Sequence, residues 1–439
     1  MKLLSALAAW VLSFSHRPPI TPNGHEGQAQ PEQAVSVPSI VVLIFGDEAK
    51  APTRDTALLA IPGAKSIELD AGPDVWKLES PIGTYTLEPI YWDPPPGESM
   101  RPFDRARFTK AELGRLLGSH LTLSLKCDLA GKGMPGFHNQ IRTLFKTATD
   151  LQLPAPIALY DPSSERWHPP AWVQRMVTSE AGPGPSMAFQ IHTVRDLTEE
   201  GVPHFWIHSH GVARLAGYEI SAVDVEQDQV RNLLSIVQSV ASYAAEGNHW
   251  PAGQPASLIY GLDIAHLPWQ QGLAILQPRY CGTEQDHDEG HRDLSILVIE
   301  QNGKWVHPGP RAARLEEVIA AVSNRETERA ALAARETYPA LRDWHRRTRI
   351  PHEVRVKARV ETTDKNHEHC WFKANKLDAT LIQATLLSTP IADSFLKPGD
   401  TTNHKLEHIT GWFVRTESDD FGPDELEALL AAEEPAKCE

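Results

Sequence analysis

The sequence predicts a multi-domain α+β protein, built from mixed or antiparallel sheets with flanking helices and ending in a small β-barrel. Its 439 residues are more than one ordinary hydrophobic core accommodates. Strand-like β-branched runs alternate with amphipathic helical stretches as far as about residue 310, which is typical of α+β sheets. Residues 350–439 differ, because short alternating strands follow one another there, a pattern that favours a small barrel or curled sheet.

The composition places the chain among globular proteins and narrows its partners. Hydrophobic residues make up 41% and charged residues 23%, a balance that disordered chains lack. The formal net charge of −15 argues against binding to nucleic acid or to an anionic membrane, since both need a positive surface. The four cysteines are far apart and form no Cys-x-x-Cys pair. We therefore predict a reducing, cytoplasmic setting without a disulfide framework or a zinc knuckle.

The N-terminus leaves two interpretations open. Residues 1–16 hold the apolar run Leu3–Phe14 behind a single Lys2, which is too short to span a bilayer as a helix. The run fits one face of a short docking helix, which we favour, or the core of a secretory signal, which would make the protein exported. Residues 17–38 are rich in proline and glycine and are predicted to be a flexible linker.

The first folded domain is predicted over residues 39–150. It begins with the β-branched run Ser39–Phe45, which indicates a buried strand. Thr109 and Glu112 form a capping-box pattern at the start of a helix, because each side chain can satisfy a backbone N–H of the first turn. Further strands are predicted at 67–69, 85–92 and 121–127, and a second helix at 138–151.

The central domain is predicted over residues 151–310. Apolar residues recur at helical spacing within Gln229–Glu246 and predict an amphipathic core helix. The stretch Glu284–Asp293 combines carboxylates with two histidines, and we favour a solvated hairpin loop there over a divalent-cation site. Other elements are predicted as strands at 155–161, 187–194, 257–262, 273–277 and 294–300, and as a helix at 167–177.

The last two segments are a charged helical linker and the barrel-like domain. Residues 311–349 carry one apolar stripe, and Pro339 is expected to interrupt the helix. Within residues 350–439, Val354, Val356 and Val360 alternate with charged side chains, as in a half-buried strand. Strands are predicted at 354–361, 369–374, 379–387 and 411–415, and a final helix at 424–434.

The candidate site lies in Phe205–Leu215, where aromatic, imidazole and glycine residues are densest. Alternation predicts a strand that ends at Gly211, followed by a second strand at Glu219–Val225. Residues i and i+2 share a face of a strand, so His208 and His210 should project together. We predict a ligand-binding cleft beside them, with Trp206, His208, His210 and Glu219 as contact residues.

The same histidines support a metal-centred alternative. The pattern His-x-His followed by Ser-x-x-Asp resembles the metal signature of the JAMM-type zinc isopeptidases, although the loop between the two parts is longer here. Catalytic zinc takes three protein ligands and keeps one position open. The resemblance implies His208, His210 and Asp224 as ligands and Ser221 as a transition-state donor, with Glu219 as the other carboxylate within reach. Histidines that are half-buried and bonded to backbone or to these carboxylates are the structural alternative.

Two further resemblances are to families of unknown function. The segment from Ala155 to Asp224, with its His-Ser-His-Gly motif, resembles the domain of unknown function 4026. Residues 368–371, 387–390, 396–400 and 409–412 resemble the domain of unknown function 2314, an uncharacterised bacterial family. Gly411 stands where that family usually has aspartate. The resemblances imply a soluble bacterial protein and bring no activity, substrate or cofactor with them.

The sequence offers no motif for a catalytic nucleophile. It has no Gly-x-Ser-x-Gly elbow, no His-Glu-x-x-His and no Walker loop. We therefore interpret the protein as a non-catalytic binding or regulatory module, with a zinc-dependent hydrolase that uses His208 and His210 as the alternative. The sequence identifies no cofactor and no particular protein or small-molecule partner, and it leaves open whether the protein is an enzyme.

Overall fold

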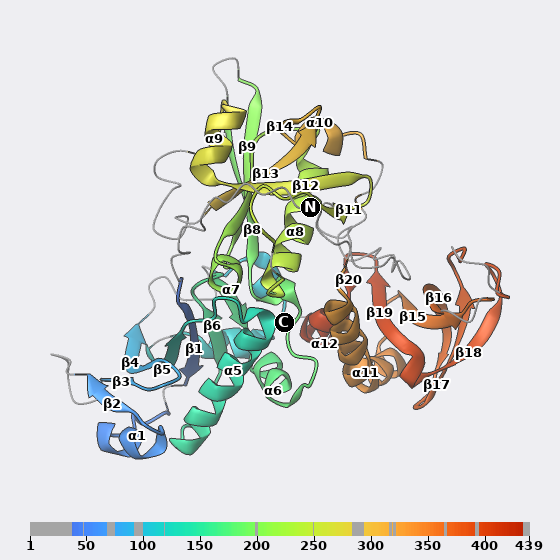
Figure 1. The fold of residues 1–439 in the computed structure, drawn as a ribbon. Coiled ribbons are helices and arrows are strands. Elements are labelled where there is room, and N and C mark those ends of the chain that lie inside the picture. The colour runs from blue at the N-terminus through green and yellow to red at the C-terminus, as the bar shows by residue number, and fades with distance from the viewer. Residues whose placement is uncertain are drawn as a thin grey trace. The chain divides into compact units, whose positions relative to one another are not determined.

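The computed structural model describes residues 37–432 except residues 47, 68–74, 92–99, 118, 198–200, 249, 283–293, 316–317, 319–321, 364–366 and 391–394. The apolar N-terminal run, nearly all of the proline-rich segment and the loop Glu284–Asp293 lie outside the described residues. The chain forms two compact units, the larger mainly from residues 36–318 and the smaller mainly from residues 319–426 (Figure 1). No described helix is long and apolar enough to cross a membrane.

The larger unit contains two sheets, and the first is antiparallel with seven strands. Strand β1, an interior strand between β5 and β6, is Ser39–Phe45, and Val41 to Phe45 are all buried, which confirms the prediction from their β-branched run. The order is β2-β3-β4-β5-β1-β6-β7. The other strands are β2 Lys65–Ile67, β3 Trp76–Glu79, β4 Thr84–Tyr91, β5 Ser119–Cys127, β6 Ala158–Asp161 and β7 Arg166–His168.

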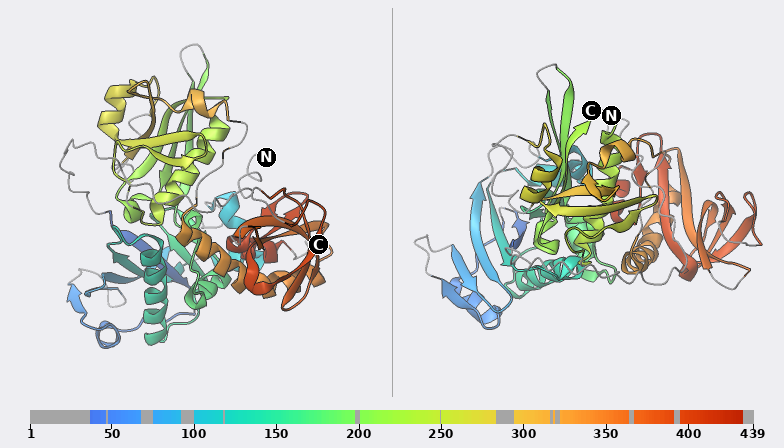
Figure 2. Two further views of the ribbon diagram at one scale, coloured as in Figure 1. Left: turned by 45° about the vertical axis from the view of Figure 1, so that its right-hand side comes forward. Right: turned by 45° about the horizontal axis from the view of Figure 1, so that its top comes forward.

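Helix α5, Gly133–Asp150, packs on this first sheet along its length (Figure 2). Its buried stripe includes Phe137, Ile141 and Leu144, and Gln140 bonds to Ser39 on β1. The predicted capping box at Thr109 is present at the start of α4. The shorter helices are α1 Arg54–Ala60, α3 Pro102–Arg105, α4 Lys110–Arg115 and α6 Pro170–Thr178.

The second sheet is mixed, because β10 (Glu219–Glu226) pairs in parallel with β13 (Leu294–Gln301) and the other pairs for which a register is given are antiparallel. Its order is β11-β12-β13-β10-β9-β8, with β14 paired to β13. Helix α8, Val230–Ala245, packs against β9 and β10, as its apolar stripe predicts. The remaining strands are β8 Gln190–Leu197, β9 Pro203–His210, β11 Ala256–Ile259, β12 Leu262–Pro268 and β14 Lys304–Val306.

The predicted strand at 273–277 is wrong, because these residues belong to helix α9, Trp269–Leu276. A short apolar run fits a strand and a buried helix equally well by periodicity. Trp269, Leu273 and Leu276 are spaced by three or four residues and pack on one core cluster with Trp206, which decides for the helix. The predicted strand at 257–262 is instead the hairpin of β11 and β12, turned at Gly261 with φ of 76°.

The smaller unit is a helix on a six-stranded antiparallel sheet, of order β18-β17-β16-β15-β19-β20. Helix α11, Asn324–Arg347, packs on β19, where the Trp412 indole donates a hydrogen bond to Thr337 (2.8 Å). Closure of this sheet into a barrel stays a prediction. The strands are β15 His352–Glu361, β16 His367–Leu377, β17 Leu381–Leu386, β18 Thr401–Lys405, β19 Ile409–Thr416 and β20 Asp420–Phe421. The final helix α12, Leu426–Ala431, belongs from Glu427 on to the larger unit.

The predicted interruption at Pro339 is wrong, since α11 continues through it. Proline in a helix interior removes one backbone hydrogen bond and costs about 3 kcal/mol. The face formed by Ala334, Tyr338 and Leu341 is buried, and that burial offsets the loss.

Buried histidines make the stability of the larger unit depend on pH. The His168 ring is fully buried, stacks on Trp172 with ring centroids 3.8 Å apart, and has Arg107 Nη1 3.1 Å from its Nδ1. Burial, and then the Arg107 charge, hold the pKa of His168 well below its usual value. Burial also lowers the pKa of His266. Both histidines are therefore neutral in the folded protein at neutral pH.

We expect the protein to lose stability as the pH falls below about 6.5, where these histidines take up protons in the unfolded chain but not in the folded one. The loss is up to about 1.4 kcal/mol per pH unit for each histidine. Urea unfolding at pH 7 and at pH 5.5 measures this loss of stability. His168→Gln should shrink the difference, whereas His408→Gln, at a side chain that is 45% exposed, should leave it unchanged. Equal unfolding free energies of the wild type at both pH values would contradict the prediction.

Candidate functional site

The predicted pair of histidines lies on β9, and a third histidine joins them from β8. His192 is the register partner of His208. The His192 ring stacks on His210 with centroids 5.0 Å apart and an interplanar angle of 9°, and meets His208 edge-on at 5.2 Å. The structure thus brings His208 and His210 together, as the alternation predicts. We call His192, His208 and His210 the imidazole cluster.

Two charged side chains flank this cluster, Arg101 from the residue before α3 and Glu165 from the turn between β6 and β7. Arg101 Nη2 lies 2.8 Å from His192 Nε2 and 2.7 Å from a carboxylate oxygen of Glu165. A guanidinium only donates hydrogen bonds, so His192 Nε2 accepts here and the ring carries its proton on Nδ1. The Arg101 and Glu165 side chains are 40% and 46% exposed, whereas His208 is 1% exposed. The cluster therefore has an accessible rim and a buried floor.

Trp206 lies behind the cluster. Its ring stacks on His208 with centroids 3.9 Å apart, and its indole N–H donates to Ser221 Oγ at 2.6 Å. Both Trp206 and Ser221 are fully buried. The predicted contact residue Trp206 thus supports the His208 ring, and the Ser221 hydroxyl is used by the indole.

Glu219 holds the turn that follows β9. Its carboxylate is buried and accepts hydrogen bonds from Ser209 Oγ (2.5 Å) and from the backbone N–H groups of Gly211 (2.7 Å), Val212 (3.1 Å) and Ala213 (2.9 Å). The turn opens the one-turn helix α7, Ala213–Ala216. Glu219 is therefore placed to fix the backbone beside His210.

Asp224 lies away from the two predicted metal ligands. It bonds to His204 Nδ1 at 2.6 Å, at the opposite end of β9 from His208. Four residues of strand separate these histidines by about 13 Å. Among the described residues, no group of three or more His, Cys, Asp or Glu side chains could hold a metal ion. The metal assignment to His208, His210 and Asp224 stays a prediction from the sequence.

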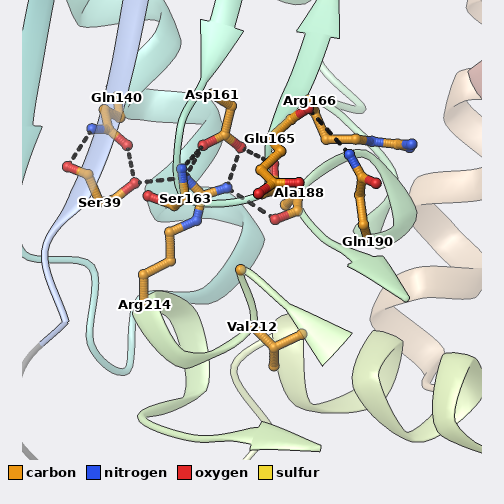
Figure 3. A network of polar contacts seen from close by, with 12 residues as sticks. Ser39, Gln140, Asp161, Ser163, Glu165, Arg166, Ala188, Gln190, Val212 and Arg214 are labelled. Atoms are coloured by element: carbon orange, nitrogen blue, oxygen red, sulfur yellow. Dashed lines mark hydrogen bonds and ion pairs between the residues drawn. The ribbon is translucent and has the colours of Figure 1, made fainter. Parts of the chain in front are cut away.

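The chain just after the cluster is anchored to the first sheet by a buried ion pair (Figure 3). Arg214 on α7 donates from Nη1 to Asp161 Oδ1 (2.6 Å) and from Nη2 to Asp161 Oδ2 (2.5 Å). The same guanidinium donates to the Ala188 carbonyl at 2.9 Å and to Ser39 Oγ at 3.1 Å. Both Arg214 and Asp161 are almost completely buried. The pair ties the strand that carries His210 to β6 of the first sheet.

Sequence reasoning missed His192, Arg101 and Glu165. His192 lies within the predicted strand 187–194, and a histidine inside that strand was the only local signal that it could join the site. Its register against His208 depends on the β8–β9 hairpin, whose connection includes residues outside the described ranges. Arg101 and Glu165 arrive by tertiary packing and leave no local pattern.

Two family models match the chain in the predicted order. Residues 191–299 match the C-terminal part of a protein family of unknown function, DUF4026, and include the whole imidazole cluster. Residues 324–432 match the family described as uncharacterised protein conserved in bacteria, DUF2314, and cover α11 and the six-stranded sheet. No curated protein and no solved structure matches the chain. The two resemblances to families of unknown function are confirmed, and neither family description gives an activity.

Proposed function

We propose that the protein is a non-catalytic binding module whose ligand contacts the imidazole cluster from its exposed rim. The observation that carries this proposal is the meeting of three histidine rings from two neighbouring strands on one partly exposed face. Imidazole and guanidinium groups both offer polar N–H donors, and a binding site fixes its ligand with a few such groups on one face.

The groups at the rim favour a ligand with a carboxylate or phosphate group. Arg101 offers five N–H donors and directs one nitrogen to Glu165 and His192. The His192 Nδ1–H and the His210 ring lie beside it. Guanidinium and imidazole donors together suit an anionic oxygen, while Glu165 limits the total charge that the site accepts.

The hydroxyl groups near the cluster support a binding role over a catalytic one. Ser209 Oγ donates to Glu219 and accepts from the Ile220 N–H, and Ser221 Oγ accepts from Trp206. Both serines are fully buried. A nucleophilic serine needs an adjacent base and access to substrate, and these two hydroxyls are engaged elsewhere.

Thermal-shift measurements with a panel of carboxylates and organic phosphates test the proposal. We expect at least one compound to stabilise the wild type and the control variant His408→Gln, and to lose at least tenfold in affinity for His192→Ala/His210→Ala. The same compound should be recovered unchanged after incubation with the protein. The assignment is refuted if every compound that binds the wild type binds His192→Ala/His210→Ala equally well. It is also refuted if no compound of the panel binds the wild type.

Metal content separates this proposal from the zinc-hydrolase alternative. Protein purified without a histidine tag is expected to hold less than stoichiometric zinc or iron. Stoichiometric metal that is lost in His208→Ala/His210→Ala, together with conversion of a panel compound, would replace the binding module by the hydrolase.

A further inference from the structure

A second site lies at the other end of β9, in a hollow of about 510 Å³. Its volume falls in the range of small-molecule pockets, which is roughly 300–1,000 Å³. It is distinct from the imidazole cluster, because none of the three cluster histidines lines it. The lining residues are Val202, Pro203, His204, Glu226, Gln227, Asp228 and Arg279. We call it the His204 hollow.

A β-bulge in β10 turns Asp224 toward this hollow's histidine. Ser221 and Ala222 pair with His208 and Ile207, but Val225 pairs with Phe205, so one extra residue is inserted between them. In an unbroken ladder, Asp224 would stand opposite Phe205 and point to the other face. Bulges re-aim side chains in this way, and Asp224 adopts a left-handed φ of 50°, which aspartate tolerates better than most residues.

The re-aimed carboxylate fixes the orientation of His204. Asp224 Oδ1 accepts from His204 Nδ1 at 2.6 Å, and the ring is only 2% exposed. In the neutral ring, a proton held on Nδ1 leaves a lone pair on Nε2. Since the ring lines the hollow and its Nδ1 edge is turned to Asp224, Nε2 is the edge that a ligand meets. This histidine is thereby set up as a hydrogen-bond acceptor.

The charges around the hollow favour a cationic ligand. Asp224, Glu226 and Asp228 contribute three carboxylates, against the single guanidinium of Arg279. Arg279 is already paired, with Asp224 Oδ2 and Glu226 Oε1 each at 3.2 Å. Asp228 is exposed on the hollow's edge. A second positive group placed here would gain Coulomb energy, and an anion would lose it.

We propose that the His204 hollow binds a small ligand through a primary ammonium group. One ammonium N–H donates to His204 Nε2, and the Glu226 and Asp228 carboxylates balance the charge. A quaternary ammonium has the charge without the N–H, and an alcohol has a donor without the charge. The site therefore requires both properties in one group.

A titration of the full-length protein with propylammonium tests this proposal. The protein is isotopically labelled at its histidines, and the imidazole NMR signals are followed. We expect propylammonium to shift the His204 signal, assigned through His204→Gln, and tetramethylammonium and 1-propanol to leave it in place. Glu226→Gln/Asp228→Asn should weaken propylammonium binding at least tenfold, while Glu300→Gln, at an exposed acid of the same sheet, should not.

The acidic double variant keeps the test independent of folding, because both replaced side chains are exposed and their amides preserve shape. If propylammonium and tetramethylammonium shift the His204 signal equally, the attraction is unspecific charge and the proposal fails. If no probe moves the signal at millimolar concentration, or if the double variant binds like the wild type, it fails as well. This test does not depend on the proposed function: if no anionic ligand binds the imidazole cluster, the result at the His204 hollow is unaffected.

Discussion

Replacing Arg214 with methionine is expected to lower the free energy of unfolding by about 3–5 kcal/mol. Arg214 and Asp161 have no exposed side-chain surface, and the guanidinium also donates to the Ala188 carbonyl. The substitution leaves the Asp161 carboxylate buried without its countercharge, and an uncompensated buried charge is the costly product of breaking such a pair. Urea unfolding at neutral pH, followed by circular dichroism, measures the change.

A double-variant cycle separates the ion pair from simple loss of packing. Arg214→Met/Asp161→Asn removes both charges, so its cost should be smaller than the sum of the two single variants by at least 1 kcal/mol. Lys146→Met is the matched surface control, because the Lys146–Asp150 pair has a lysine that is 75% exposed and should contribute less than about 1 kcal/mol. An Arg214→Met variant as stable as Lys146→Met would contradict the role given to the buried pair.

The consequence of this pair for the site follows from its position in the chain. Arg214 lies four residues after His210, within the helix that the Glu219 carboxylate caps. Its anchor, Asp161, ends β6, and Glu165 of the rim lies in the turn between β6 and β7. The buried pair therefore joins the two segments that supply the cluster and its rim, and loosening it should also weaken ligand binding at the cluster.

The sequence predicted the parts of the site that depend on local periodicity. Strand alternation was enough to place His208 and His210 on one face, and the β-branched run was enough for β1. The position of Asp224 could not be predicted, since a one-residue bulge reverses the face on which a strand residue points. Glu219 and Asp224 look alike as carboxylates near a histidine pair, and only the tertiary structure shows that one caps a turn and the other orients His204.

The wrong assignment at Leu273 has the same origin. An apolar run of four residues, such as Leu273–Leu276, satisfies a strand and one face of a helix alike. The packing partner, Trp206 from a strand far away in sequence, selects the helix. Elements that are decided by such long-range partners are the ones that a reading of a single sequence leaves undetermined.

Replacing Glu219 with glutamine is expected to lower the free energy of unfolding by about 2–4 kcal/mol. The carboxylate accepts four hydrogen bonds, from Ser209 and from three successive backbone N–H groups, and it is 2% exposed. Glutamine keeps one acceptor oxygen and places an NH₂ group against donors that have no other partner in this turn. Bonds to a charged acceptor contribute about 1.5–3 kcal/mol each, and a buried donor left unsatisfied costs about 1–3 kcal/mol.

Glu226→Gln is the control for this substitution, because it makes the same chemical change on the same strand at an exposed residue and should alter stability by less than about 0.5 kcal/mol. Since the Glu219 carboxylate holds the backbone next to His210, Glu219→Gln should also shift the imidazole NMR signal of His210 while that of His204 stays in place. A variant that unfolds at the wild-type urea concentration with an unmoved His210 signal would mean that the turn holds itself without the carboxylate. The cluster would then owe its geometry to the β8–β9 ladder alone, in which His192 and His208 are direct partners.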